Sequence, residues 1–179
     1  GKGYAWNPTN FVGRDKNPTD PDLSLEGYWM GLADFVKSFS GPLKTLALTA
    51  AVLPVSEDVN SGFGREDHVN VAGKLYFLFY DTDIDLMALS EGSRPDIDGL
   101  TASRNVTSKF EIHGELPLTT DFEKRLIGAD GAVTTQVDDA WSYLAGIRYL
   151  APTDTTFIVE YYHNGKGYTG EEVNDFFDF

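Results

Sequence analysis

Apolar and polar side chains alternate at every second residue over most of the chain, a pattern typical of β-strands that have two different faces. The longest such stretch runs from Val69 to Tyr80. Its odd positions, from Val69 to Phe79, are apolar or glycine, whereas its even positions include Asn70 and Lys74. We therefore predict a strand here with one apolar face and one mixed face.

Turn sequences divide the alternating stretches into antiparallel hairpins. Short turns are predicted at 40–42, 81–83 and 152–155, where Gly, Pro, Ser, Thr and Asp residues cluster. The strands on either side are expected at 29–39, 46–52, 69–80, 84–89, 141–149 and 157–164. A Gly-Pro pair in the first turn also excludes a continuous helix there, because proline cannot continue a helical hydrogen-bond ladder.

A further single strand is predicted from Arg104 to Leu116, where the alternation is most regular. Its apolar positions are Val106, Phe110, Ile112 and Leu116, and its polar positions are Asn105, Thr107, Lys109, Glu111, His113 and Glu115. A soluble core would not accept the polar set, because buried charges are costly unless they are paired. This strand is expected to place its polar side chains in water.

The alternation is weak between Thr119 and Asp139. Only 122–127 is predicted as a strand in this region, and the glycines of 128–131 indicate a loop. Helical periodicity is limited to the last ten residues, which we interpret as an acidic loop or a short helical turn. The fold class is therefore all-β, an antiparallel up-and-down meander of seven or eight strands.

Loop lengths and aromatic positions distinguish a membrane barrel from a soluble one. The connections at 55–68, 91–102 and beyond 165 are long and polar, and they alternate with the short turns, as external loops and periplasmic turns do in outer-membrane barrels. Aromatic residues lie near the strand ends, where interfacial girdles are found: Trp29, Phe39, Tyr80, Trp141, Tyr149, Tyr161 and Tyr162. Both features favour a transmembrane β-barrel, or part of one.

Composition narrows the classes of function. The 179 residues carry a formal net charge of −14, which argues against nucleic acid as a partner because phosphate backbones require clustered Lys and Arg. The absence of cysteine excludes a disulfide scaffold and thiolate chemistry. No apolar run approaches the roughly 20 residues of a membrane helix.

Two hairpin sequences carry a family resemblance. The stretch 143–150 (YLAGIRYL) and the stretch 160–168 (EYYHNGKGY) resemble hairpins of porin-like outer-membrane β-barrel proteins of Gram-negative bacteria, and 3–8 (GYAWNP) is similar to the loop before a barrel strand. The resemblance implies a location in the bacterial outer membrane, contact with the lipid bilayer and lipopolysaccharide, and passage of small solutes.

Three parts of the chain follow from this interpretation. We expect an external loop or N-terminal extension over 1–23, barrel hairpins over 24–165, and an external loop with an acidic tail over 166–179. If the short turns are periplasmic, both ends of the chain lie outside, whereas bacterial barrels ordinarily keep both in the periplasm. The chain is therefore expected to be an internal segment of a larger barrel.

The polar positions of several strands supply candidate pore-lining residues: Lys74, Asp85, Lys109, Glu111, His113, Glu115, Arg148 and Glu160. Opposed acidic and basic rows would set a transverse field across a water-filled pore. Alternatively, the same residues form ion pairs that fill a narrow barrel interior. The sequence favours neither alternative.

No pattern indicates catalysis or a cofactor. The Asp residues at 81, 83 and 85 have a spacing that could offer oxygen ligands to calcium, but a solvated turn explains them more simply. The three histidines lack metal-ligand spacing, and no nucleophile motif accompanies them. We predict a non-enzymatic passive pore or transport channel. The alternative is a soluble, secreted or periplasmic β-barrel or sandwich that binds a small ligand or glycan through Tyr and Trp.

Overall fold

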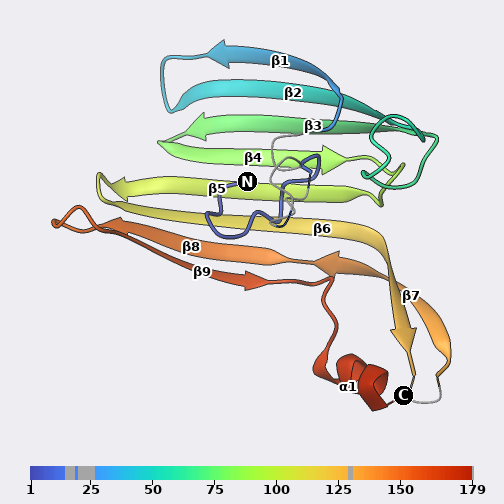
Figure 1. The fold of residues 1–179 in the computed structure, drawn as a ribbon. Helices are drawn as coiled ribbons and strands as arrows, with labels where there is room; N and C mark the ends of the chain where they lie inside the picture. The colour runs from blue at the N-terminus through green and yellow to red at the C-terminus, as the bar shows by residue number, and fades with distance from the viewer. Residues whose placement is uncertain (15–18, 20–26, 129–130, 179) are drawn as a thin grey trace.

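The computed structural model describes residues 1–14, 19, 27–128 and 131–178. Nine strands form one antiparallel sheet in the order β1-β2-β3-β4-β5-β6-β8-β9, with β7 paired to β6 (Figure 1). The strands are β1 (Gly31–Ser38), β2 (Leu43–Val55), β3 (His68–Phe79), β4 (Thr82–Leu89), β5 (Ile97–Thr107), β6 (Phe110–Ile127), β7 (Val133–Trp141), β8 (Tyr143–Leu150) and β9 (Thr156–His163), and a helix α1 (Gly170–Asp178) follows. The predicted all-β antiparallel meander is confirmed. The sheet is not closed into a barrel: β1 and β9 end its path, and β7 pairs with β6 alone.

The single strand predicted over 104–116 is wrong. The chain turns at Ser108 and Lys109, so this stretch is the end of β5 and the start of β6, and β5 begins at Ile97 within the predicted long loop 91–102. A register shift lies between Asn105 and Thr107. A two-residue turn alone would exchange the faces of odd and even positions, but this bulge restores their phase. The alternation therefore continues through the turn without a visible break.

The weak alternation after Thr119 has a similar cause. The strand predicted over 122–127 is confirmed as part of β6, and β7 pairs with it. A bulge between Thr119 and Phe122 places Asp121 at a φ of 49° and swaps the parity of every later residue in β6. The pattern changes phase there, so a search for continuous alternation misses the hairpin.

The two ends of the sheet differ in the length of their connections. The β1–β2, β3–β4, β5–β6 and β8–β9 turns are short and lie at one end, on the left in Figure 1. The β2–β3 and β4–β5 connections are longer and lie at the opposite end, the long-loop end. Part of the predicted loop 128–131, and residues 15–18 and 20–23 of the predicted external loop or extension 1–23, lie outside the described residues.

The main apolar core lies near the long-loop end. Its buried members come from the N-terminal segment, three strands and the β2–β3 loop: Phe11, Leu53, Val55, Phe63, Leu89 and Ile97. The Arg94 guanidinium lies 4.1 Å from the Phe63 ring centroid, and its Nη1 donates to the Phe11 carbonyl at 3.4 Å. Burying each large apolar side chain contributes about 1.5–3 kcal/mol. This cluster therefore fixes the long loops and residue 11 onto the sheet.

The helix α1 begins with a capping box. The Thr169 backbone N–H donates to Glu172 Oε2 at 2.6 Å, and the Glu172 N–H donates to Thr169 Oγ1 at 3.3 Å. Lys124 Nζ on β6 lies 2.6 Å from the same Glu172 oxygen. Of the acidic loop or short helical turn predicted for the last ten residues, the helical alternative is present, and the Thr-x-x-Glu spacing is a sequence signal for it. Within the described residues, no helix is both long and apolar enough to cross a membrane.

Candidate functional site: the polar face of the sheet

Strand register divides the sheet into two faces. One set of directly paired residues runs across six strands and is wholly apolar: Phe35, Leu48, Leu75, Leu86, Leu100 and Leu116. The neighbouring set continues the same chemistry to the far edge: Leu46, Phe77, Ile84, Ala102, Gly114, Ala145 and Tyr161. We call the surface that carries both rows the apolar face. It has the parity that the sequence predicted.

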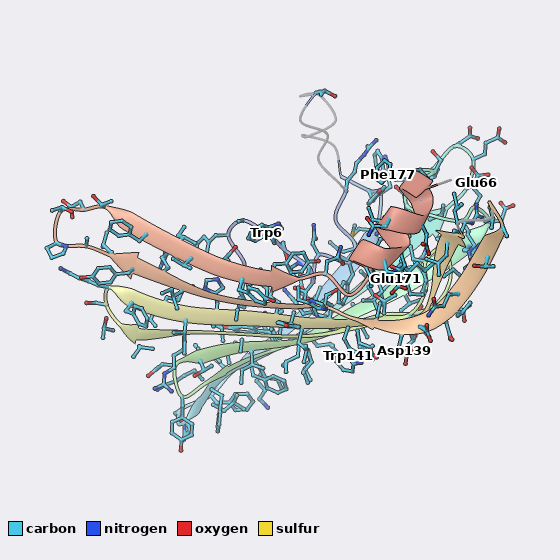
Figure 2. The ribbon with its side chains drawn as sticks, turned by 90° about the horizontal axis from the view of Figure 1, so that it is seen from below. Trp6, Glu66, Asp139, Trp141, Glu171 and Phe177 are labelled. Carbon is cyan, nitrogen blue, oxygen red and sulfur yellow. The ribbon has the colours of Figure 1, made fainter. Side chains whose placement is uncertain are left out.

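The opposite surface, the polar face, carries charged and hydroxylated residues in the corresponding rows. One row contains Tyr76, Asp85, Thr101, Glu115, Leu144 and Tyr162, and the next contains Asp83, Ser103, His113, Gly146 and Glu160. Figure 2 shows Trp6 and α1 on this side of the sheet and Trp141 on the other. Most of the sequence-predicted site residues therefore share one face.

Two of the predicted residues do not join the cluster at the centre of this face. Lys74 on β3 has the right parity but is exposed. Lys109 lies in the β5–β6 turn rather than in a strand, because the chain reverses there, and its carbonyl accepts a hydrogen bond from the Leu150 N–H at 2.8 Å. Lys109 is therefore removed from the predicted polar row.

Asp85 on β4 is buried at the centre of the polar face. Its Oδ2 accepts a hydrogen bond from Thr101 Oγ1 at 2.9 Å and lies 3.2 Å from Lys2 Nζ. Thr101 is completely buried. Burial of a carboxylate is tolerated when charged and polar donors replace the lost water, as these two do.

A second group joins β6, β8 and β9. Arg148 Nη2 lies 2.8 Å from Glu111 Oε2, and His113 Nε2 lies 2.9 Å from Glu160 Oε1. The other ring nitrogen, His113 Nδ1, is 3.6 Å from Glu111 Oε1, which is too long for a hydrogen bond. A Cβ atom at Gly146 would overlap the His113 ring, so the missing side chain there makes room for the histidine.

The N-terminal segment supplies the partners that these carboxylates lack. Glu115 accepts hydrogen bonds from the backbone N–H groups of Lys2, Gly3 and Thr9 and from the Thr9 hydroxyl. Glu160 accepts from the Tyr4 and Ala5 N–H groups at 2.5 and 2.9 Å. Residues 2–9 thus lie across the polar face, held by two strand carboxylates.

Two aromatic side chains of this segment contact the same face. The Tyr4 hydroxyl lies 3.2 Å from both oxygens of Glu111, and its ring meets His113 edge-on at 5.3 Å between centroids. Trp6 stacks on Tyr162 of β9 at 5.9 Å. Both aromatic residues remain about half exposed, so they form part of the surface that solvent meets.

Sequence reasoning found the charged residues but not their partners. Acidic residues outnumber basic ones on this face, and that imbalance was the available signal for an additional source of donors. The donors are backbone amides more than 100 positions away in sequence, as the separation of 112 between Gly3 and Glu115 illustrates. No residue-type pattern identifies such donors, because every non-proline residue has an N–H group.

The arrangement holds a polypeptide segment against the strands through buried carboxylates. Within the described residues, no group of three or more His, Asp or Glu side chains could hold a metal ion. The Asp residues at 81, 83 and 85 do not converge: Asp81 lies in a turn, Asp83 accepts from the Tyr76 hydroxyl at 2.5 Å, and Asp85 binds Lys2 and Thr101.

Comparison with known proteins identifies no relative. No protein-family model matches the chain, and neither a curated protein nor a solved structure matches it.

Proposed function

We propose that the sheet is part of the wall of a transmembrane β-barrel in the bacterial outer membrane, and that this barrel acts as a passive pore for small solutes. The observation that carries the proposal is the contrast between the two faces. An apolar, exposed face is suited to lipid, whereas a face of buried carboxylates, hydroxyls and a histidine is suited to a wet interior.

The apolar face is too extensive for an uncovered surface in water. Members of a single row remain widely exposed, with 67% for Phe35, 45% for Leu48, 46% for Leu86 and 41% for Leu100. Six strands at about 4.8 Å spacing make this surface roughly 25 Å wide. Monomeric soluble proteins rarely expose contiguous apolar patches above a few hundred Å². Lipid chains would cover it without further protein.

The unbroken apolar face also ends at the bulge at Asp121. Beyond it, the residues of β6 on this side are Glu123, Arg125 and Ile127, which pair with Val137, Thr135 and Val133 of β7, so two charged side chains interrupt the apolar pattern. Trp141 lies close to this boundary and is 52% exposed. At the short-turn end, Tyr149 and Phe157 form a directly paired aromatic patch. Aromatic side chains favour the interface between hydrocarbon and water, so the two patches suit its two boundaries.

The polar face favours a barrel wider than the sheet itself. In an eight-stranded barrel the interior is just wide enough for side chains or one small ligand. Here a stretch of main chain, residues 2–9, lies on the polar face and is hydrogen-bonded to it. We therefore infer that additional strands pair with β1 and β9 and widen the lumen.

The soluble alternative, a secreted ligand-binding barrel or sandwich, needs something to cover the apolar face. Both α1 and the N-terminal segment lie on the other side (Figure 2). A ligand site formed by Tyr and Trp would leave the leucine row in water, so this alternative explains less of the molecule.

The three tryptophans provide a direct test, because Trp6 and Trp141 lie on opposite sides of the sheet. Single-tryptophan variants would be refolded into vesicles whose acyl chains carry bromine, a short-range fluorescence quencher. We expect strong quenching of Trp141 and weak quenching of Trp6, with the reverse order for aqueous iodide. Equal quenching of the two residues, or a chain that stays monomeric in detergent-free buffer, would contradict the proposal.

A further inference from the structure

We propose that residues 1–9 form a plug that narrows the lumen and sets the size limit for solutes. This inference rests on the pore proposed above and assigns a role to a segment that the sequence places in an external loop or N-terminal extension. Three features support it: the anchors of the segment, its position on the polar face, and the aromatic groups it presents to solvent.

Glu115 is the first anchor, and it holds the segment at two points. Its Oε1 accepts from the N–H groups of Lys2 and Gly3, and its Oε2 accepts from the Thr9 N–H at 3.1 Å and the Thr9 hydroxyl at 2.7 Å. Glu115 is 3% exposed and Thr9 is 2% exposed. One buried carboxylate therefore closes residues 2–9 into a loop.

Glu160 is the second anchor and holds the middle of that loop. It accepts from the Tyr4 and Ala5 N–H groups, and its Oε1 also lies 2.9 Å from His113 Nε2. Lys2 adds a third contact through Asp85 on β4. The segment is thus tied to β4, β6 and β9, three separate strands of the sheet.

These contacts satisfy both partners, which makes the position of the segment specific. The backbone N–H groups of residues 2–9 have no strand or helix to pair with, and the buried carboxylates need donors in place of water. Hydrogen bonds to a charged acceptor are stronger than neutral ones. A segment that rested on the sheet by chance would not direct its N–H groups at two buried carboxylates.

The plug lies where it would obstruct passage. Figure 1 shows the N-terminal trace crossing β5 and β6 near the middle of their length, not at the rim. Tyr4 and Trp6 are 46% and 48% exposed, so about half of each side chain would face the lumen while the rest contacts the sheet. Removing residues 1–9 would widen the passage and leave Phe11 in the core, because Phe11 is fixed independently by the apolar cluster.

The test compares conductance and solute uptake of the native protein and three variants in planar bilayers and liposomes. The first variant lacks residues 1–9. The second is Glu115→Gln with Glu160→Gln, in which each amide nitrogen would face a backbone donor instead of accepting from it. The control is Glu123→Gln with Glu171→Gln, which also removes two negative charges but at exposed positions outside the plug contacts.

We expect both plug variants to raise unitary conductance several-fold and to admit larger sugars, while the control keeps the native size limit. An unchanged conductance and size limit in the deletion variant would overturn the plug and leave the pore intact. The deletion leaves the strands that carry Glu115 and Glu160 unchanged. It therefore remains informative if the double variant fails to fold.

Failure of the pore itself is recognised separately. If none of the forms conducts although Trp141 is quenched by brominated lipid, the barrel is closed to solutes and both the pore and the plug's role in it are overturned. If brominated lipid does not quench Trp141 at all, the membrane location is overturned, and the pore and plug that depend on it are overturned with it.

Discussion

The two faces of the sheet share the same strands and backbone but are stabilised in different ways. On the apolar face, rows of leucine remain exposed, and Gly73 has open space around its α-carbon. On the polar face, buried carboxylates depend on particular donors, and Gly146 is packed against His113. The first face tolerates changes in shape but is restricted in polarity, whereas the second depends on geometry. This contrast can be tested by placing a charge on the apolar face and by changing the packing on each face.

The largest effect is expected from a charge on the apolar face. Leu86→Arg places a cation in the middle of the leucine row. In a bilayer this costs about 2–4 kcal/mol of folding free energy near the midplane, whereas in water an exposed Leu→Arg change costs roughly 0.5 kcal/mol or less. Denaturant titration of refolding into vesicles measures the difference. Glu123→Arg, on the same side beyond the bulge, serves as the control and should change stability little.

The next effect separates the two glycines. Gly146→Ala forces the His113 ring to move and should destabilise the protein by about 1–3 kcal/mol. Gly73→Ala meets nothing within 4 Å and should be neutral or stabilise by about 0.5 kcal/mol, because glycine is unfavourable within a strand. The urea concentrations at the unfolding midpoints of the two variants measure this difference in stability. Equal destabilisation would show that the faces are packed alike.

A smaller effect is expected at Arg148. The change Arg148→Glu places a second carboxylate beside Glu111 in place of the guanidinium that lies 2.8 Å from it. Since the Arg148 side chain is 41% exposed, the loss of stability should be only about 1 kcal/mol. Reversal potentials in a salt gradient should move toward cation selectivity. An unchanged reversal potential would indicate that this pair only fills space.

The smallest effect concerns pH at α1, which lies on the polar side. Hydrogen bonds from Lys124 and from the Thr169 backbone lower the pKa of Glu172. A carboxyl group with a lowered folded pKa contributes stability above its unfolded pKa, about 4.3, and loses that contribution as the pH falls through the folded value. Helix docking, followed by NMR of the last ten residues, should therefore weaken below pH 4. Glu172→Gln should abolish this dependence, whereas Glu171→Gln should preserve it.

Much of the sheet could be predicted because alternation is a local property. The apolar parity of β2, β3, β4, β8 and β9 was predicted correctly, since each strand keeps its phase over the predicted range, and the register shift in β2, between Leu43 and Thr45, lies before that range. The prediction failed where a bulge changes the phase, as at Asp121, or restores it across a turn, as at Thr107. A bulge adds one residue that has no distinctive chemistry of its own.

The candidate site was predictable only in its charged half. Glu111, His113, Glu115, Arg148 and Glu160 follow from strand parity. The hydrogen bonds from residues 2–9 could not be predicted in this way, because their donors are backbone N–H groups from a distant part of the chain. Lys109 was misplaced for a local reason, since Thr107 and the Lys109 N–H form a 3.2 Å turn contact that alternation does not reveal.

If the sheet is part of the proposed barrel, the order of its strands restricts how that barrel could be completed. Along the path from β1 to β9 each strand reverses direction, so the two edge strands run in opposite senses. A ring that remains antiparallel at every seam can therefore be completed only by an even number of inserted strands. Since the main chain on the polar face needs room, the smallest addition is one complete hairpin.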